Sequence, residues 1–240
     1  MRIAACRAIG VVALALTSLS ALASPADPVP FRATYHLSVE GWPDAQIDHR
    51  LSRHGELWQS EMQATISIAE GEERSRFRVD SKGIDARAYV SGYSLLGFGE
   101  RYRLTEDDLA TLPDRQTALF ALSRRAPDAR CTQTEDENET APCTLRYLDY
   151  EGEQKTLRYR VVMHGETRLP IGTFPSVTVD SWDPEKPDRQ LVFTFHRDIP
   201  GLLLGVEYRR DGERRSRLTL TQLTLPNKAL PAHAPTHQQP

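Results

Sequence analysis

The chain has 240 residues, of which 39% are hydrophobic and 26% are charged, and its formal net charge is -3. This length and composition suit one globular domain with its own hydrophobic core. Nothing in a net charge of -3 calls for a nucleic acid partner, so we expect none.

The N-terminus has the pattern of a cleavable secretion signal. Arg2 and Arg7 give a positive start, and the apolar stretch 9–16 that follows is too short to span a bilayer. Ala21-Leu22-Ala23 then supplies the small-x-small pattern that a signal peptidase recognises. We expect cleavage after Ala23 and export to the periplasm. Basic residues then fall from 30 to 28 against 33 acidic ones, so the mature net charge is -5.

Two of the three cysteines remain after cleavage, because Cys6 leaves with the signal. An even pair in an oxidising compartment predicts a disulfide between Cys131 and Cys143. Such a bridge across a short polar loop contributes on the order of 3 kcal/mol. The acidic run 135–139 inside that loop lacks the spacing of a calcium loop, and the histidines do not converge on one centre. We therefore predict no metal site and no cofactor.

The first half of the chain has the alternation of antiparallel strands. Apolar and polar residues alternate with period two over 31–39, 46–53 and 58–68, and the pattern continues after Gly71 to Val90. Each run therefore has one apolar and one polar face, which is typical of a sheet with one face buried and one face in water.

Two short helices are predicted in the middle of the chain. Thr105 has the features of an N-cap before an acidic first turn, and Pro113 interrupts that helix. A second helix begins at Asp114, where Ala118, Leu119 and Leu122 share one face that can pack on the sheet.

Hairpins fill the rest of the chain up to its last 15 residues. Turns are predicted at Glu151-Gly152, at 183–188 and at Asp211-Gly212, which is a strong hairpin signal. We divide the chain into a signal peptide (1–23), a linker (24–30), one antiparallel β domain (31–225) and a disordered tail (226–240). The predicted fold is mainly β, a curved antiparallel sheet or open β-barrel with one or two short helices.

Catalytic motifs are weak in this sequence. Ser94 lies in the segment GYSLLG, where the second glycine comes one residue too late for the G-x-S-x-G elbow of hydrolases. We therefore expect a protein that is not an enzyme, and a hydrolase is the least favoured alternative.

Two apolar, glycine-punctuated segments lie between strands, where turns are usually polar. They predict the rim of a ligand cavity. The candidate rim residues are Tyr93, Leu95, Leu96, Phe98, Leu202, Leu203 and Leu204. The alternative is that both segments plug the open end of the sheet. Arginines on the outer faces, such as Arg74, Arg76 and Arg78, suit a solvated face or contact with anionic lipid headgroups.

The opening PFRATYHLSVEGW, the segment DRQTALFAL and the pair LDYEGEQKTLRYRVV and TRLPIGTFPSVTVD resemble a bacterial exported family, catalogued as domain of unknown function 3108. The resemblance runs from Phe31 to about Leu223. It implies an exported protein with a curved sheet or open barrel, similar in shape to lipocalins and lipoprotein carriers, and it implies no catalytic residue.

These observations favour a periplasmic, non-enzymatic protein that binds or carries an apolar or lipid-like ligand in a concave sheet. The alternative is an envelope assembly or interaction factor that docks a protein partner at a sheet edge. In either case we expect a soluble monomer, with contact to a membrane surface left open.

Overall fold

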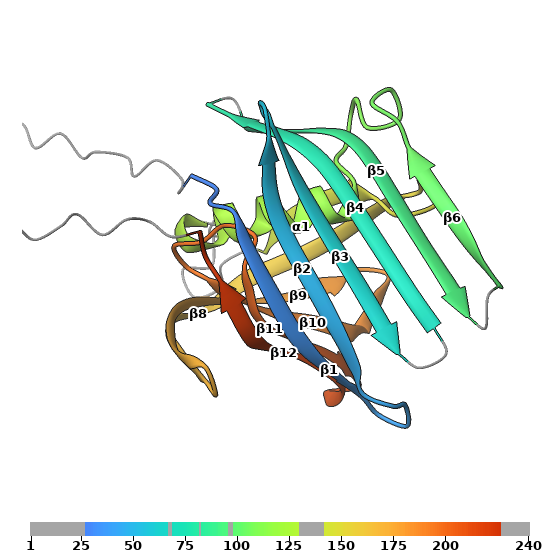
Figure 1. The fold of residues 1–240 in the computed structure, drawn as a ribbon. Helices are drawn as coiled ribbons and strands as arrows, with labels where there is room; N and C mark the ends of the chain where they lie inside the picture. Colours follow the sequence, from blue (N-terminus) through green and yellow to red (C-terminus); the bar gives the residue numbers. More distant parts are fainter. Residues whose placement is uncertain (1–26, 67–68, 82, 96–97, 130–141, 227–240) are drawn as a thin grey trace, which may run out of the picture.

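The structure, a computed structural model, describes residues 27–66, 69–81, 83–95, 98–129 and 142–226 (Figure 1). The predicted signal peptide, Leu96, Cys131 and nearly all of the predicted tail lie outside these residues. The predicted disulfide therefore stays a prediction. Within the described residues the fold is mainly antiparallel β, as predicted: one open, curved sheet of twelve strands.

The first six strands form one half of the sheet and the last six form the other. The first half consists of β1 (Phe31–Val39), β2 (Ala45–His54), β3 (Leu57–Ile66), β4 (Ala69–Asp80), β5 (Gly83–Leu95) and β6 (Phe98–Leu104). The second half consists of β7 (Cys143–Leu148), β8 (Gln154–Leu169), β9 (Gly172–Asp183), β10 (Lys186–His196), β11 (Leu203–Arg210) and β12 (Glu213–Thr224). Between them lie the helix α1 (Arg115–Arg125) and the short 3-10 turn η1 (Ala126–Asp128).

The strand order is β6-β5-β4-β3-β2-β1-β12-β11-β10-β9-β8-β7. Consecutive strands pair from β1 to β6 and from β7 to β12, and β1 also pairs with β12, in antiparallel register. The first and last strands thus meet in the middle of the sheet. Its two edges, β6 and β7, are the strands that flank α1 in the sequence.

The sheet curves until side chains near its two edges touch. Tyr102 of β6 meets Tyr150, just beyond β7, with ring centroids 4.9 Å apart. Leu148, at the end of β7, packs against the small apolar cluster that contains Leu104 of β6. The backbone N–H of Leu148 donates to the carbonyl oxygen of Pro113 at 2.9 Å. No ladder joins β6 to β7 among the described strands, so the sheet is open.

The apolar phase of the strands forms the concave face, and α1 lies inside the curve between β4 and β7 (Figure 1). Phe31, Ala33 and Tyr35 of β1 are buried while the residues between them are not, which confirms the alternation. Phe120 of α1 packs on Phe77 of β4, with ring centroids 4.7 Å apart. The helix predicted from Asp114 is confirmed, and Asp114 is its N-cap.

Two predictions of local structure are wrong. Residues 105–113 form turns and bends rather than a helix. The backbone N–H of Leu109 donates to the Thr105 carbonyl oxygen at 3.1 Å, which closes one helical turn, and Pro113 has no N–H to extend that ladder. The segment 93–99 is not an irregular loop. β5 continues to Leu95 and β6 begins at Phe98, so the segment belongs to a hairpin.

The hairpin between β11 and β12 follows the sequence prediction. Asp211 and Gly212 have φ angles of 52° and 78°. Two consecutive positive φ angles are what a two-residue hairpin turn needs to match the twist of its strands.

Candidate ligand-binding site

Two cavities open on the concave face, one beside the other. The outer cavity, of about 450 Å³, lies over β2 to β6 and has walls from Ile47, Met62, Ala64, Tyr93, Tyr102 and Tyr150. The inner cavity, of about 270 Å³, lies under α1 and has walls from Leu119, Leu122, Leu145, Leu157, Leu191 and Phe193. Met62, Glu73 and Arg115 line both cavities, so these three residues form the boundary between them.

Strand alternation puts the apolar walls of the outer cavity on the concave side. Ile47 lies two residues before the buried His49 in β2, and Met62 lies two residues after the buried Ser60 in β3. Residues two apart in a strand share a face. Because α1 covers only one part of this face, the part that carries Ala64 and Tyr93 remains open to the outer cavity.

Glu73 and Arg115 form a two-pronged ion pair at the boundary. Arg115 Nε and Nη2 donate to Glu73 Oε1 and Oε2 at 2.7 and 3.0 Å. The Tyr89 hydroxyl donates to Glu73 Oε1 at 2.8 Å, and the Tyr150 ring lies 5.5 Å from Arg115 Cζ. Burial, followed by the charge of Glu73, raises the pKa of Tyr89 above its ordinary value, so its hydroxyl remains a donor. Both charges are therefore compensated within the site.

Asp114 fixes the N-terminus of α1 to β4. Its Oδ1 accepts from the backbone N–H groups of Gln116 and Thr117 at 3.0 and 2.9 Å. Its Oδ2 accepts from the hydroxyls of Ser75 and Thr117 at 2.7 and 2.8 Å. Burial raises the pKa of the Asp114 carboxyl, and these hydrogen bonds oppose that rise. Glu73 and Ser75, two residues apart on β4, thus hold consecutive residues of the helix start.

Gln116 lines the inner cavity, and neither polar atom of its side chain has a partner among the residues that the structure describes. The residue is only 5% exposed. Within the described part of the chain, neither Oε1 nor Nε2 makes a hydrogen bond. Most buried side-chain amides are satisfied, so this one is unusual.

The predicted rim residues fall into two groups. Tyr93, Leu95 and Phe98 are 55%, 48% and 84% exposed at the β5–β6 hairpin, and Tyr93 lines the outer cavity. Leu96 lies outside the described residues.

The second predicted rim segment lies in the core. Leu202, Leu203 and Leu204 are 0%, 2% and 0% exposed, and none of them lines the outer or the inner cavity. Gly201, at φ +84°, turns this segment against α1, and its N–H donates to the Ser123 hydroxyl at 2.7 Å. The three leucines then enter the main hydrophobic cluster, and the segment plugs the fold.

Sequence reasoning missed Glu73, Arg115 and Gln116. The signal for Glu73 was present: if Arg74 and Arg76 face outward, then Glu73 and Ser75 must face inward. Gln116 is three residues before Leu119 on α1, a spacing that places both on one helix face.

Burial keeps the imidazole ring of His49 uncharged. The ring packs edge-on against Phe31, with centroids 4.9 Å apart, and His49 Nε2 lies 2.9 Å from Ser60 Oγ. Burial lowers the pKa of His49 to about 3, so the ring is neutral at physiological pH. It lines neither cavity.

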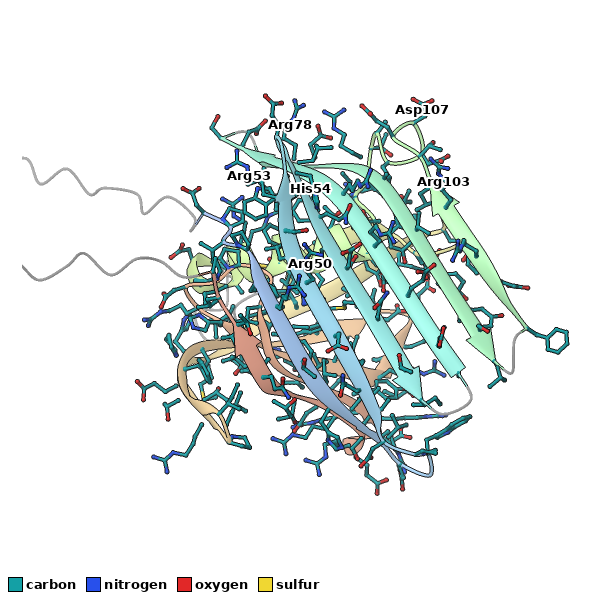
Figure 2. All side chains as sticks on the ribbon, in the orientation of Figure 1. Arg50, Arg53, His54, Arg78, Arg103 and Asp107 are labelled. Atoms are coloured by element: carbon teal, nitrogen blue, oxygen red, sulfur yellow. The ribbon has the colours of Figure 1, made fainter. Side chains whose placement is uncertain are left out.

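Polar and charged side chains dominate the outer face of the first half of the sheet. Figure 2 labels Arg50 and His54 of β2 and Arg78 of β4, which lie on that side. Arg78 Nη2 lies 3.2 Å from Glu56 Oε2, and Arg74 Nε lies 2.9 Å from Glu61 Oε1. Exposed pairs of this kind contribute little stability and fit a solvated face.

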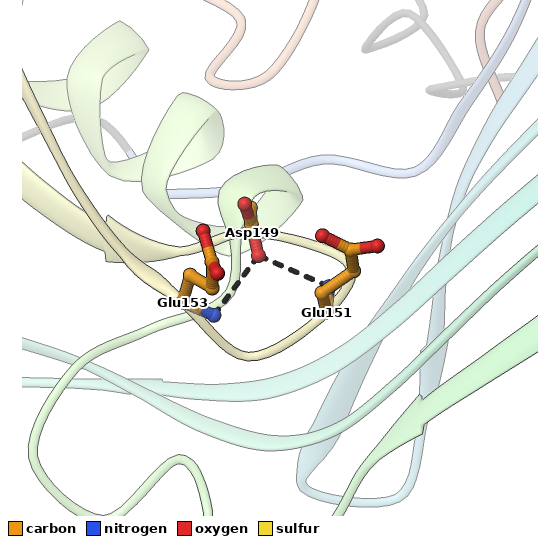
Figure 3. A group of neighbouring side chains, drawn as sticks. All are labelled: Asp149, Glu151 and Glu153. Atoms are coloured by element: carbon orange, nitrogen blue, oxygen red, sulfur yellow. Dashed lines mark hydrogen bonds between the residues drawn. The ribbon is translucent and has the colours of Figure 1, made fainter.

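Three carboxylates gather at the β7–β8 turn (Figure 3). Asp149 Oδ1 accepts from the backbone N–H groups of Glu151 and Glu153 at 3.0 and 2.9 Å, which shapes the turn. Lys155 Nζ lies 2.6 Å from Glu153 Oε2 and 3.3 Å from Asp149 Oδ2. Turn geometry and one lysine account for this cluster, and we assign it no metal.

No family model matches the chain, and no curated protein matches it. Among solved structures, a crystal structure of MucB is 14% identical, with a TM-score of 0.36 over 82% of this chain and 53% of that one. MucB in the Pseudomonas aeruginosa MucA/MucB complex is 13% identical, with a TM-score of 0.38 over 81% of this chain and 51% of that one. The chain thus spans about half the length of these MucB chains. With similarity this low, we take neither fold nor function from them.

Among the described residues, no helix is both long and apolar enough to cross a bilayer.

Proposed function

We propose that this is an exported, non-enzymatic protein that binds an apolar or lipid-like ligand between the concave face of its sheet and α1. The observation that carries the proposal is the pair of adjoining cavities with mostly apolar walls, of about 450 and 270 Å³. Volumes of this size are typical of small-molecule sites, and cavities inside curved sheets commonly hold apolar ligands.

The walls suit an elongated apolar molecule. Met62 stands at the boundary between the cavities, and its unbranched thioether side chain can adapt to a ligand that passes from one cavity to the other. Each methylene group that leaves water contributes about 0.8 kcal/mol to the binding free energy. A hydrocarbon chain long enough to fill both cavities therefore binds most tightly.

The polar groups at the boundary support binding over catalysis. Both oxygens of Glu73 accept hydrogen bonds from Arg115, and one of them also accepts from Tyr89. A carboxylate engaged in this way is a weak general base, since a base must be free to reach the proton that it takes. The same bonds fix the shape of the site.

Cavity filling tests the proposal. We expect wild-type protein to enhance the fluorescence of N-phenyl-1-naphthylamine, and Ala64→Trp, which fills the outer cavity, to weaken its binding at least tenfold. Ala88→Trp is the matched control, because Ala88 pairs with Arg76 on the outer face of the sheet. A wild-type protein that binds no apolar probe, or equal binding by both variants, would reject the proposed function.

A second candidate is the docking of an extended peptide on the β6 edge. Among the described strands β6 pairs only with β5, and the exposed Leu95 and Phe98 lie at the tip of that hairpin. An unpaired edge can accept a further strand, with apolar side chains giving specificity. Photo-crosslinking from position 100, an exposed residue of β6, tests this in the periplasm: a protein crosslink that Phe98→Lys leaves unchanged counts against it.

Periplasmic location and membership of the family catalogued as domain of unknown function 3108 are also proposals. They rest on the Arg2 to Ala23 pattern and on the segments that resemble the family. Mass spectrometry of the secreted protein tests the first, because we expect a mature N-terminus at Ser24 and a disulfide between Cys131 and Cys143.

A further inference from the structure

We infer that Gln116 binds the polar head of the ligand, and that the ligand is a neutral amphiphile: a hydrocarbon chain that ends in an amide or hydroxyl group. This inference rests on the proposed function and adds to it the chemical class of the ligand and the residue that selects it.

The first observation is the orientation of Gln116. Its backbone N–H donates to Asp114 Oδ1 at 3.0 Å, which fixes the residue in the first turn of α1. The residue lines the inner cavity, is 5% exposed and has both amide atoms buried. Neither amide atom has a partner among the described residues. An unpaired buried amide costs stability, and a ligand that supplies the missing bonds removes that cost on binding.

The second observation is the charge balance around the cavity. Arg115 is the only cation among the described residues that line either cavity. Its guanidinium is already paired with the Glu73 carboxylate, to which Nε and Nη2 donate at 2.7 and 3.0 Å. An anionic head beside Gln116 would meet the Glu73 carboxylate without a free cation, and a cationic head would meet the Arg115 guanidinium. The site therefore favours a head without net charge.

The third observation is the contrast between the amide and its surroundings. Leu119, Leu122, Leu157 and Leu191 surround the inner cavity, so the chain next to the head must be apolar. A side-chain amide has both donors and an acceptor. An amide or a hydroxyl head offers the complementary pair, whereas an alkane leaves both atoms of Gln116 unpaired.

Competition against N-phenyl-1-naphthylamine tests the inference with four ten-carbon probes: decanamide, 1-decanol, n-decane and, at pH 8, decanoate. For wild-type protein we expect decanamide and decanol to bind about tenfold more tightly than decane or decanoate. Gln116→Met keeps the side-chain volume but removes the amide. It should abolish the preference over decane by weakening only the two neutral polar probes.

The control variant is Gln222→Met, because Gln222 is exposed on β12. It should keep the wild-type preference. Stability gives an independent readout: if Gln116 is unpaired in the free protein, Gln116→Met should be at least as resistant to urea as wild type.

The outcomes separate the two proposals. If no probe binds wild-type protein, the proposed function fails. If wild type binds all four probes equally, or if Gln116→Met retains the preference or weakens all probes alike, apolar binding stands and the role of Gln116 is refuted. A Gln116→Met variant that is clearly less stable would also refute it, because the amide would then be satisfied in the free protein.

Discussion

The buried histidine on β2 makes stability depend on pH in a calculable way. Burial lowers the pKa of His49 to about 3, from the ordinary value of 6.5 that applies when the chain is unfolded. The unfolded state therefore binds one more proton than the folded state between pH 6.5 and pH 3. Stability from this residue is complete above pH 6.5 and is lost as the pH falls. From pH 7 to pH 5 the loss from this one group is about 2 kcal/mol.

Urea denaturation at pH 7 and pH 5 measures this loss, with His49→Gln as the comparison. Glutamine does not titrate and can still bond to Ser60, so the variant should lose about 2 kcal/mol less than wild type over this interval. Carboxylates and His196, whose pKa is also lowered by burial, contribute equally to both proteins and cancel in the difference. His54→Gln, on the exposed end of β2 (Figure 2), should behave as wild type. Equal losses in wild type and His49→Gln would refute the argument.

Four further substitutions probe the helix anchor and the core. Asp114→Ala should cost about 2 kcal/mol or more in urea, because it removes the N-cap acceptor and strands a buried hydroxyl; a loss under about 1 kcal/mol would contradict this. Leu202→Ala should cost about 2–5 kcal/mol and Leu95→Ala almost nothing, and similar losses would argue against a buried Leu202. Gly201→Ala should lower the melting temperature by several degrees, since φ is +84° and its Cβ would lie 2.7 Å from Phe120; an unchanged melting temperature would count against this turn.

Most of the fold was predictable from the alternation of apolar and polar residues along the strands. It works for β1, where Phe31, Ala33 and Tyr35 are buried, because a sheet with one wet face forces every second residue into the core. It fails where apolar residues occupy both phases. Tyr93 to Phe98 looked like a loop because glycines interrupt it, yet hydrogen bonding to β4 extends β5 through Leu95. The residues around Tyr93 alone do not reveal that β4 will pair with this part of β5.

The site was harder to predict, because its polar residues act through distant contacts. Glu73 and Arg115 are 42 positions apart, and nothing near either one in the sequence identifies the other. Apolar loops posed the same difficulty: the segments at Leu95 and Leu202 have similar composition, but only the second meets α1 and becomes buried. Exposure of an irregular apolar segment depends on what packs against it, which periodicity does not encode.

The meeting of β1 and β12 in the middle of the sheet has a consequence for how the chain folds. The other strand pairs, β1 to β6 and β7 to β12, are hairpins between neighbours, which form early because their loops are short. The β1–β12 seam joins Arg32 to Thr224 and closes almost the whole chain. During synthesis, therefore, β1 remains an uncapped edge until the last strand has been made, and such edges invite aggregation. We expect the nascent protein to need a chaperone for longer than its short hairpins suggest.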